Sequence, residues 1–141
     1  MKRLYSLSLF ATIVLLTACG KENLSSGREL VGSWVDVNHT ADTLEFFKKG
    51  GIVVLLDNSL TYRTIRQNST NFDLLTNQYE VRMGGGELFT RPLTMRETGL
   101  ENFFREKFEW VDGKQSFTVE PNGFRPYLSC TGCPQRFRRI D

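Results

Sequence analysis

The chain contains a single histidine, His39, and histidine is the side chain that most often moves protons near neutral pH. His39 lies in the polar segment Val37–Asp42, close to Asp36 and Asp42, and together these groups could bind a metal ion or a polar ligand at the mouth of a cavity. A solvated loop histidine is the other interpretation. Catalysis needs a base held by a third group beside a nucleophile, and no phosphate loop, zinc-hydrolase pair or nucleophile elbow is visible. We therefore expect no enzymatic activity, no metal and no cofactor.

Two of the three cysteines, Cys130 and Cys133, are separated by two residues. In an oxidising compartment this spacing favours a disulfide around a tight turn, contributing roughly 2 kcal/mol through loop entropy. Three alternatives remain. A thiol oxidoreductase motif has the same spacing but lies where a strand meets a helix, a structural zinc site needs four protein ligands, and haem attachment needs histidine where Pro134 stands.

The third cysteine ends the sequence Leu16–Cys19, which resembles the lipobox of bacterial lipoproteins. An apolar stretch over residues 4–16, preceded by Lys2 and Arg3, completes the resemblance and is too short to span a bilayer of about 30 Å. The resemblance implies that residues 1–18 are a signal peptide and that Cys19 receives a diacylglyceryl thioether and an N-acyl chain, which together anchor a protein stably. An ordinary secretory signal, leaving Cys19 as a free thiol, is the alternative.

Lipidation at Cys19 would place the mature chain in the cell envelope, and Gly20, where an aspartate would favour the inner membrane, points to the outer membrane. Residues 19–29 are polar and are expected to form the lipidated cysteine and a flexible tether, followed by one domain over residues 30–141. The formal net charge of +2 becomes zero without Lys2 and Arg3. A neutral mature chain excludes the basic excess that is typical of nucleic-acid-binding proteins.

Beyond the tether, apolar side chains recur mostly at every second position, with turn signals about every eight to twelve residues. The fold class predicted by this pattern is all-β, and about eight strands suit a small closed antiparallel up-and-down barrel. Asp112-Gly113 is the strongest turn signal, because both central residues of a type I′ hairpin have positive φ. The expected strands include residues 43–46, 52–56, 60–65, 79–83, 108–111, 117–119, 124–128 and 137–140.

One stretch has helical spacing instead. Leu100, Phe103 and Phe104 would share a helix face, and the sequence from Thr98 to Glu101 is that of a capping box. A short helix near residues 99–105 is therefore an alternative to a strand.

Gly32-Ser33-Trp34, on the first expected strand, resembles the Gly-x-Trp signature of lipocalins and related calycins. Its placement before a second strand and a glycine turn is also similar to small lipocalin-like lipoproteins of Bacteroidota. The resemblance implies a barrel whose closed end is covered by the tryptophan, with an arginine of the last strand, Arg138 or Arg139, stacked over it. Such a cation–π contact contributes roughly 0.5–2 kcal/mol.

The eleven phenylalanines offer two interpretations of the barrel interior. Phe46, Phe89, Phe104, Phe108 and Phe117 would fill it as core residues, or the interior would be an aromatic cavity for a small apolar ligand. In the second case the candidate ligand-binding residues are His39, Tyr62, Tyr79, Phe89 and Phe108.

The resemblance to lipocalins predicts a membrane-anchored protein that binds a small apolar or amphipathic ligand. The alternative is a non-catalytic interaction protein of the envelope, a scaffold or a hydrolase inhibitor, with a filled barrel. The basic residues Arg125, Arg136, Arg138 and Arg139 either solvate strand ends or contact lipid phosphates or an acidic partner.

Overall fold

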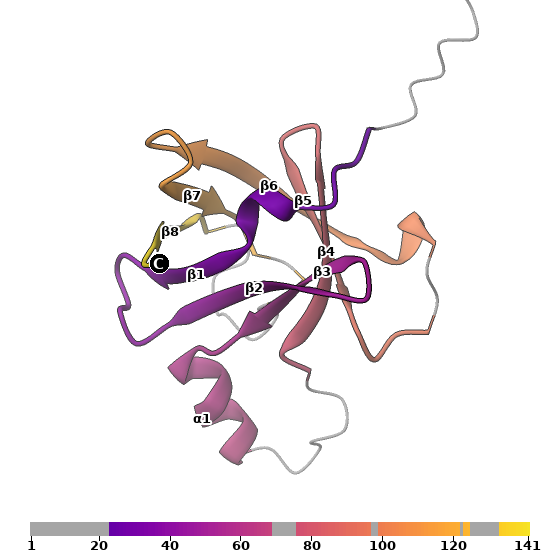
Figure 1. Ribbon diagram of the computed structural model, residues 1–141. Coiled ribbons are helices and arrows are strands. Elements are labelled where there is room, and N and C mark those ends of the chain that lie inside the picture. Colours follow the sequence, from indigo (N-terminus) through magenta and orange to yellow (C-terminus); the bar gives the residue numbers. More distant parts are fainter. Residues whose placement is uncertain (1–22, 69–75, 97–98, 122, 125–132) are drawn as a thin grey trace, which may run out of the picture.

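Figure 1 shows the computed structural model, which describes residues 23–68, 76–96, 99–121, 123–124 and 133–141. Eight antiparallel strands form a closed barrel in which each strand pairs with the next along the chain and β8 pairs with β1. The predicted all-β up-and-down barrel is confirmed. The strands are β1 (Gly32–Asp36), β2 (Thr43–Lys49), β3 (Ile52–Asp57), β4 (Gln78–Gly84), β5 (Glu87–Pro92), β6 (Phe104–Val111), β7 (Ser116–Val119) and β8 (Gln135–Arg139).

Three tight hairpins join β2 to β3, β4 to β5 and β6 to β7. Each has residues with positive φ at its tip: Gly50 and Gly51 in the first, Gly85 and Gly86 in the second, and Asp112 with Gly113 in the third. The β6–β7 hairpin lies where it was predicted, but its connection has four residues: Lys114 also has a positive φ (71°), and the amide of Gln115 donates to the carbonyl of Asp112 (3.1 Å), so the central residues of the turn are Gly113 and Lys114.

The predicted strand over residues 60–65 is wrong, because this segment forms the helix α1 (Leu60–Asn68). The residues before it do not form a hairpin turn but cap the helix. The Ser59 hydroxyl accepts a hydrogen bond from the amide of Tyr62 (3.0 Å), and Asp42 accepts one from the amide of Leu60 (2.9 Å). Two free amides of the first turn are thereby satisfied, which favours helix over strand.

The helix expected near residues 99–105 is a single 3-10 turn, Leu100–Asn102, after which β6 begins at Phe104. The strand predicted over residues 124–128 lies outside the described residues except for Phe124.

Aromatic side chains fill the barrel interior. The ring of Phe117 lies at the centre, with ring centroids 4.8 Å from Trp34, 5.2 Å from Phe137 and 5.3 Å from Phe108. Burying each large apolar side chain stabilises the fold by about 1.5–3 kcal/mol. The largest fully buried apolar side chains are Trp34, Phe46, Phe89, Phe117, Phe124, Phe137, Leu30, Leu44, Leu55 and Leu88.

Two phenylalanines depart from the expected core. Phe89 is buried but lies on the outer face of the barrel, since it pairs with Arg82 and Arg105 while its neighbour Leu88 joins the core. Phe104 is 42% exposed.

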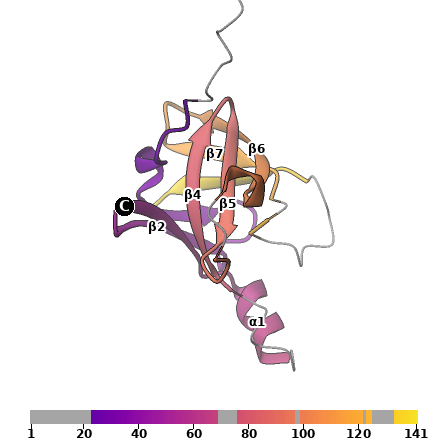
Figure 2. The ribbon, with the colours of Figure 1, turned by 90° about the vertical axis from the view of Figure 1, so that its right-hand side faces the viewer.

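The up-and-down topology divides the connections between two ends. The tether end consists of the three tight hairpins and residues 23–31, and the loop end consists of the described parts of the longer connections, residues 37–42, 58–68, 76–77, 93–96, 99–103, 120–121, 123–124 and 133–134. Figure 2 shows α1 extending from the loop end, on the side opposite the β4–β5 hairpin.

Candidate functional site

Trp34 and Arg139 join the first and last strands near the tether end. The two residues are paired in the β1–β8 register, and the guanidinium carbon of Arg139 lies 4.5 Å from the centroid of the Trp34 ring. The indole nitrogen of Trp34 donates a hydrogen bond to the carbonyl of Leu30 (2.8 Å), so its one polar group is satisfied although the residue is fully buried. Arg139, not Arg138, is therefore the arginine that stacks on the tryptophan.

The same contact explains the glycine of the Gly-x-Trp sequence. Gly32 has φ of 136°, and a Cβ atom there would lie 2.7 Å from the carboxylate of Asp141 and 2.9 Å from the guanidinium of Arg139. A side chain at this position would therefore strain the backbone and displace the arginine.

The remaining arginines of the basic cluster do not act together. Arg136 forms an exposed ion pair with Asp112, and Arg138 is exposed on β8 opposite Val35. Arg125 lies outside the described residues.

A cleft of about 400 Å³ opens in the barrel wall at the tether end. It lies where β6 extends past β5: their paired register ends at Glu87, the first residue of β5, and residues 108–111 of β6 pair with β7 on the other edge of the strand. The amide of Phe108 still donates to the carbonyl of Gly86 (2.9 Å), which marks the edge of the opening.

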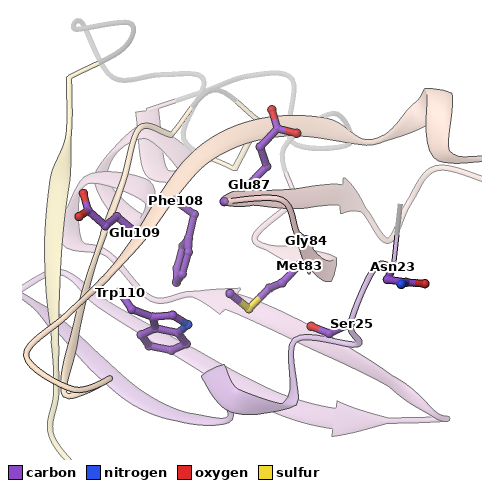
Figure 3. A pocket seen from close by; sticks show the side chains of 9 residues that line it. Asn23, Ser25, Met83, Gly84, Glu87, Phe108, Glu109 and Trp110 are labelled. Carbon is purple, nitrogen blue, oxygen red and sulfur yellow. The ribbon is translucent and has the colours of Figure 1, made fainter. Parts of the chain in front are cut away.

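Apolar side chains converge on this cleft. Figure 3 shows Met83, Phe108 and Trp110 directed toward one another, whereas the carboxylates of Glu87 and Glu109 point away. The rings of Phe108 and Trp110 meet edge to face at a centroid distance of 5.1 Å, and Trp110 is only partly buried. Two aromatic rings and a thioether favour an uncharged apolar group as ligand.

A neighbouring cleft of about 460 Å³ has a different character. Its lining includes Lys107 and Glu109, which alternate with core positions on β6, and Glu120, which follows β7. Charged side chains of this kind are readily solvated, so this cleft is the weaker candidate for an apolar ligand.

Residues 23–30 lie against the barrel beside the apolar cleft. Ser25 pairs with Met83 through two backbone hydrogen bonds of 2.6 and 3.0 Å, and Leu30 is fully buried. The side chain of Leu24 packs against Gly84, where a Cβ atom would come within 2.7 Å of it. The described part of the expected tether, residues 23–29, is thus fixed to β4, and Asn23 and Ser25 form one side of the cleft.

The other residues predicted as ligand-binding do not meet at one place. His39 has a side chain 73% exposed at the loop end, 3.9 Å from a carboxylate oxygen of Asp36. Tyr62 is buried on α1, and the hydroxyl of the buried Tyr79 donates to the carbonyl of Thr76 (3.0 Å). Phe89 lies on the outer face, so Phe108 alone of the five lines the apolar cleft.

The acidic neighbours of His39 are engaged by backbone amides. Asp36 accepts hydrogen bonds from the amides of Asn38 (2.8 Å) and His39 (3.2 Å), and Asp42 accepts from that of Leu60. Within the part of the chain that the structure describes, no three histidine, cysteine or acidic side chains gather as a metal site would require.

A polar cluster lies on the outer wall, away from the cleft. Glu80 accepts hydrogen bonds from Arg82 (2.9 Å) and from Arg91, and the ring of Phe103 covers both guanidinium groups at 4.8 and 5.4 Å. Burial raises the pKa of Glu80, but the hydrogen bonds and positive charges of Arg91 and Arg82 outweigh it, so the pKa lies below its ordinary value. This cluster holds the β5–β6 connection to the barrel.

Cys133 is exposed two residues before β8 begins at Gln135, whereas Cys19 and Cys130 lie outside the described residues, so both cysteine predictions stay open. Among the described residues, no helix has both the length and the apolar character needed to cross a membrane. In comparisons with family models, curated proteins and solved structures, no match was found. A function must therefore be inferred from the geometry.

Proposed function

We propose that the protein is a lipid-anchored, lipocalin-like protein of the cell envelope, at the outer membrane, that binds a small apolar or amphipathic ligand in the cleft beside its tether. The observation that carries this proposal is the convergence of Met83, Phe108 and Trp110 on an opening of about 400 Å³. That volume lies within the range of about 300–1,000 Å³ typical of small-molecule sites. The ligand is held at the barrel wall, because the interior is occupied by aromatic side chains.

The anchor is supported by the leader sequence and by the position of the cleft. Lys2, Arg3, the apolar stretch over residues 4–16 and the lipobox-like sequence Leu16–Cys19 support lipidation. Asn23, four residues after Cys19, lines the cleft, so the acyl chains and the ligand site belong to the same end of the molecule. Cys130 and Cys133 form a structural disulfide in this proposal, and the protein has no catalytic role.

Ligand binding is tested with protein purified from its natural host and stripped of its anchor. Native mass spectrometry should show an additional small mass, and a fluorescent fatty-acid probe should be displaced by that molecule. Met83→Lys, which places an ammonium group among the aromatic rings, should abolish probe binding. Met95→Lys is the matched control, because Met95 is exposed at the loop end. Equal probe binding by both variants would contradict the proposed site.

Lipidation is tested by metabolic labelling with a clickable fatty acid. The wild-type chain should be labelled and Cys19→Ala should not, whereas Cys133→Ala should keep the label because it leaves the lipobox intact. A Cys19→Ala chain labelled as strongly as the wild type would exclude the anchor.

A second candidate function, a non-catalytic interaction protein of the envelope, is favoured by the filled interior. Phe46, Phe117 and Phe137 are each at most 1% exposed, and barrels of eight strands are often wholly filled by side chains. In that case the protein would act as a scaffold or a hydrolase inhibitor through its loop-end connections. A clean apo mass together with no probe displacement would favour this function over ligand binding.

A further inference from the structure

We infer that the ligand of the cleft is a single acyl chain taken directly from the membrane to which the protein is anchored. This inference rests on the proposed function, since it requires both lipid on Cys19 and binding at the cleft. It adds the chemical class of the ligand, its source and its route of entry.

The membrane is the expected source of the ligand, because only a short length of chain separates the anchor from the cleft. Ser25 is fixed to Met83 by backbone hydrogen bonds, and Asn23 lines the cleft. The four residues from Cys19 to Asn23 span at most about 14 Å even when fully extended, less than half of the roughly 30 Å hydrocarbon core of a bilayer. The cleft is therefore held near the headgroups, where acyl chains are the most concentrated apolar groups.

The route by which the ligand enters follows from the position of the cleft in the barrel wall. The cleft lies beside the part of β6 that extends past β5, between the β4–β5 hairpin and residues 23–25, so it opens through the wall at the tether end. Toward the loop end, by contrast, the buried side chains of Tyr79 and Phe124 occupy the interior, with their rings in edge contact at a centroid distance of 6.3 Å. A ligand coming from the membrane reaches the cleft without passing through the barrel.

The chemical class follows from the lining. Met83, Phe108 and Trp110 present apolar surface, and the two carboxylates at the rim are directed away from it. Such a surface contacts the hydrocarbon of a lipid and does not require a particular headgroup. The unbranched thioether of Met83 adapts to a flexible chain, and a volume near the lower end of the small-molecule range favours one chain over a bulky ring system.

The fluorescence of the two tryptophans can be used to test this inference. Mature lipidated protein is reconstituted into phosphatidylethanolamine–phosphatidylglycerol vesicles whose phospholipid acyl chains carry bromine, which quenches indole fluorescence on contact. Trp110 is partly exposed in the cleft, whereas Trp34 is fully buried. We expect strong quenching of the wild type, and loss of most of it in Trp110→Phe, which retains Trp34 and an aromatic ring at the cleft. Equal quenching of Trp110→Phe would overturn the inference.

Met83→Lys should lose the quenching while Met95→Lys keeps it, with near-ultraviolet circular dichroism showing that both variants are folded. Because only the vesicle phospholipids are brominated, occupation of the cleft by the acyl chains of Cys19 would give no quenching and would overturn the inference. A soluble brominated fatty acid distinguishes ligand binding at the cleft from uptake of the ligand from the membrane. If it quenches Trp110 while the vesicles do not, ligand binding stands and uptake from the membrane fails; if neither quenches, both fail.

Discussion

The two ends of the barrel reverse the chain in different ways. The tether end uses tight hairpins with glycines at positive φ, and its strands are joined by aromatic and cation–π contacts around Trp34. The loop end uses long connections whose backbone amides are satisfied by buried carboxylates, as Asp36 and Asp42 show. The cleft therefore lies at the end with the short turns, whereas in the described loop-end connections carboxylates satisfy the backbone amides and Phe124 packs into the core.

The largest effect is expected from Trp34→Ala at the tether end. The ring is fully buried and contacts Phe117 at 4.8 Å, so its removal should lower the free energy of unfolding by about 3–5 kcal/mol. Urea denaturation followed by far-ultraviolet circular dichroism measures this loss. Phe104→Ala, at a side chain 42% exposed beside the loop end, should cost much less. Equal losses would show that stability is not concentrated in the aromatic cluster.

A smaller loss is expected at the loop end from Glu106→Ala. The buried carboxylate of Glu106 accepts hydrogen bonds from the hydroxyl of Thr90 (2.7 Å) and from the amide of Gly123 (2.9 Å). Leaving these buried donors without that acceptor should cost about 1–3 kcal/mol. Glu106→Gln keeps an acceptor oxygen and should recover part of the stability in the same denaturation assay. A Gln variant no more stable than the Ala variant would mean that these hydrogen bonds are not the cause.

Arg139→Lys should cost still less, although it keeps the positive charge. Arg139 stacks on Trp34 and also donates to the carbonyls of Val31 (3.1 Å) and Glu29 (3.0 Å). A lysine lacks the planar group that makes these contacts together, and we expect a loss of roughly 0.5–2 kcal/mol. Arg138→Lys is the matched control and should be neutral, because Arg138 is exposed on the same strand. If both variants lose stability equally, charge alone explains the effect.

The smallest effect is expected in the pH profile of stability. The pKa of Glu80 is lower in the folded chain than its ordinary value of 4.5, so its contribution is fully present above that value and is lost as the pH falls through the folded-state pKa. Between pH 7 and pH 5, Glu80 should therefore contribute no pH dependence to the free energy of unfolding. Thermal unfolding of wild type and Glu80→Gln, compared across pH 2 to 7, tests this, and the difference between them should shrink only in the acidic part. A difference that shrinks already above pH 5 would contradict the lowered pKa.

The strands were predictable because alternation is local. Residues 43–46, 52–56 and 108–111 lie in strands as expected, and Asp112-Gly113 lies in the hairpin between β6 and β7. Leu60–Asn68 was not predicted as a helix, because the cap from Asp42 is eighteen residues away in the sequence and only Ser59 gave a local signal.

The candidate site was harder to predict than the fold. The cleft depends on where the β5–β6 register ends and on the pairing of Ser25 with Met83. Neither feature can be predicted from the local periodicity of apolar residues. Alternation of Phe108 and Trp110 on β6 was the one available signal. It could not show that Phe89 belongs to the outer wall, because residues on both faces of β5 are buried.

The pairing of β1 with β8 also sets an order of events during folding. Trp34 is paired with Arg139, and the amide of Ser33 donates to the carboxylate of Asp141 (2.7 Å), so residues more than a hundred positions apart must meet before the sheet closes. A chain that is synthesised from its amino end therefore presents its first strand long before its partner. Until β8 emerges, β1 presents an unpaired edge and the aromatic rings of the interior stay accessible to water. Such non-local closure is slow relative to hairpin formation, so the emerging chain passes through an incomplete sheet with an unpaired edge and exposed apolar side chains.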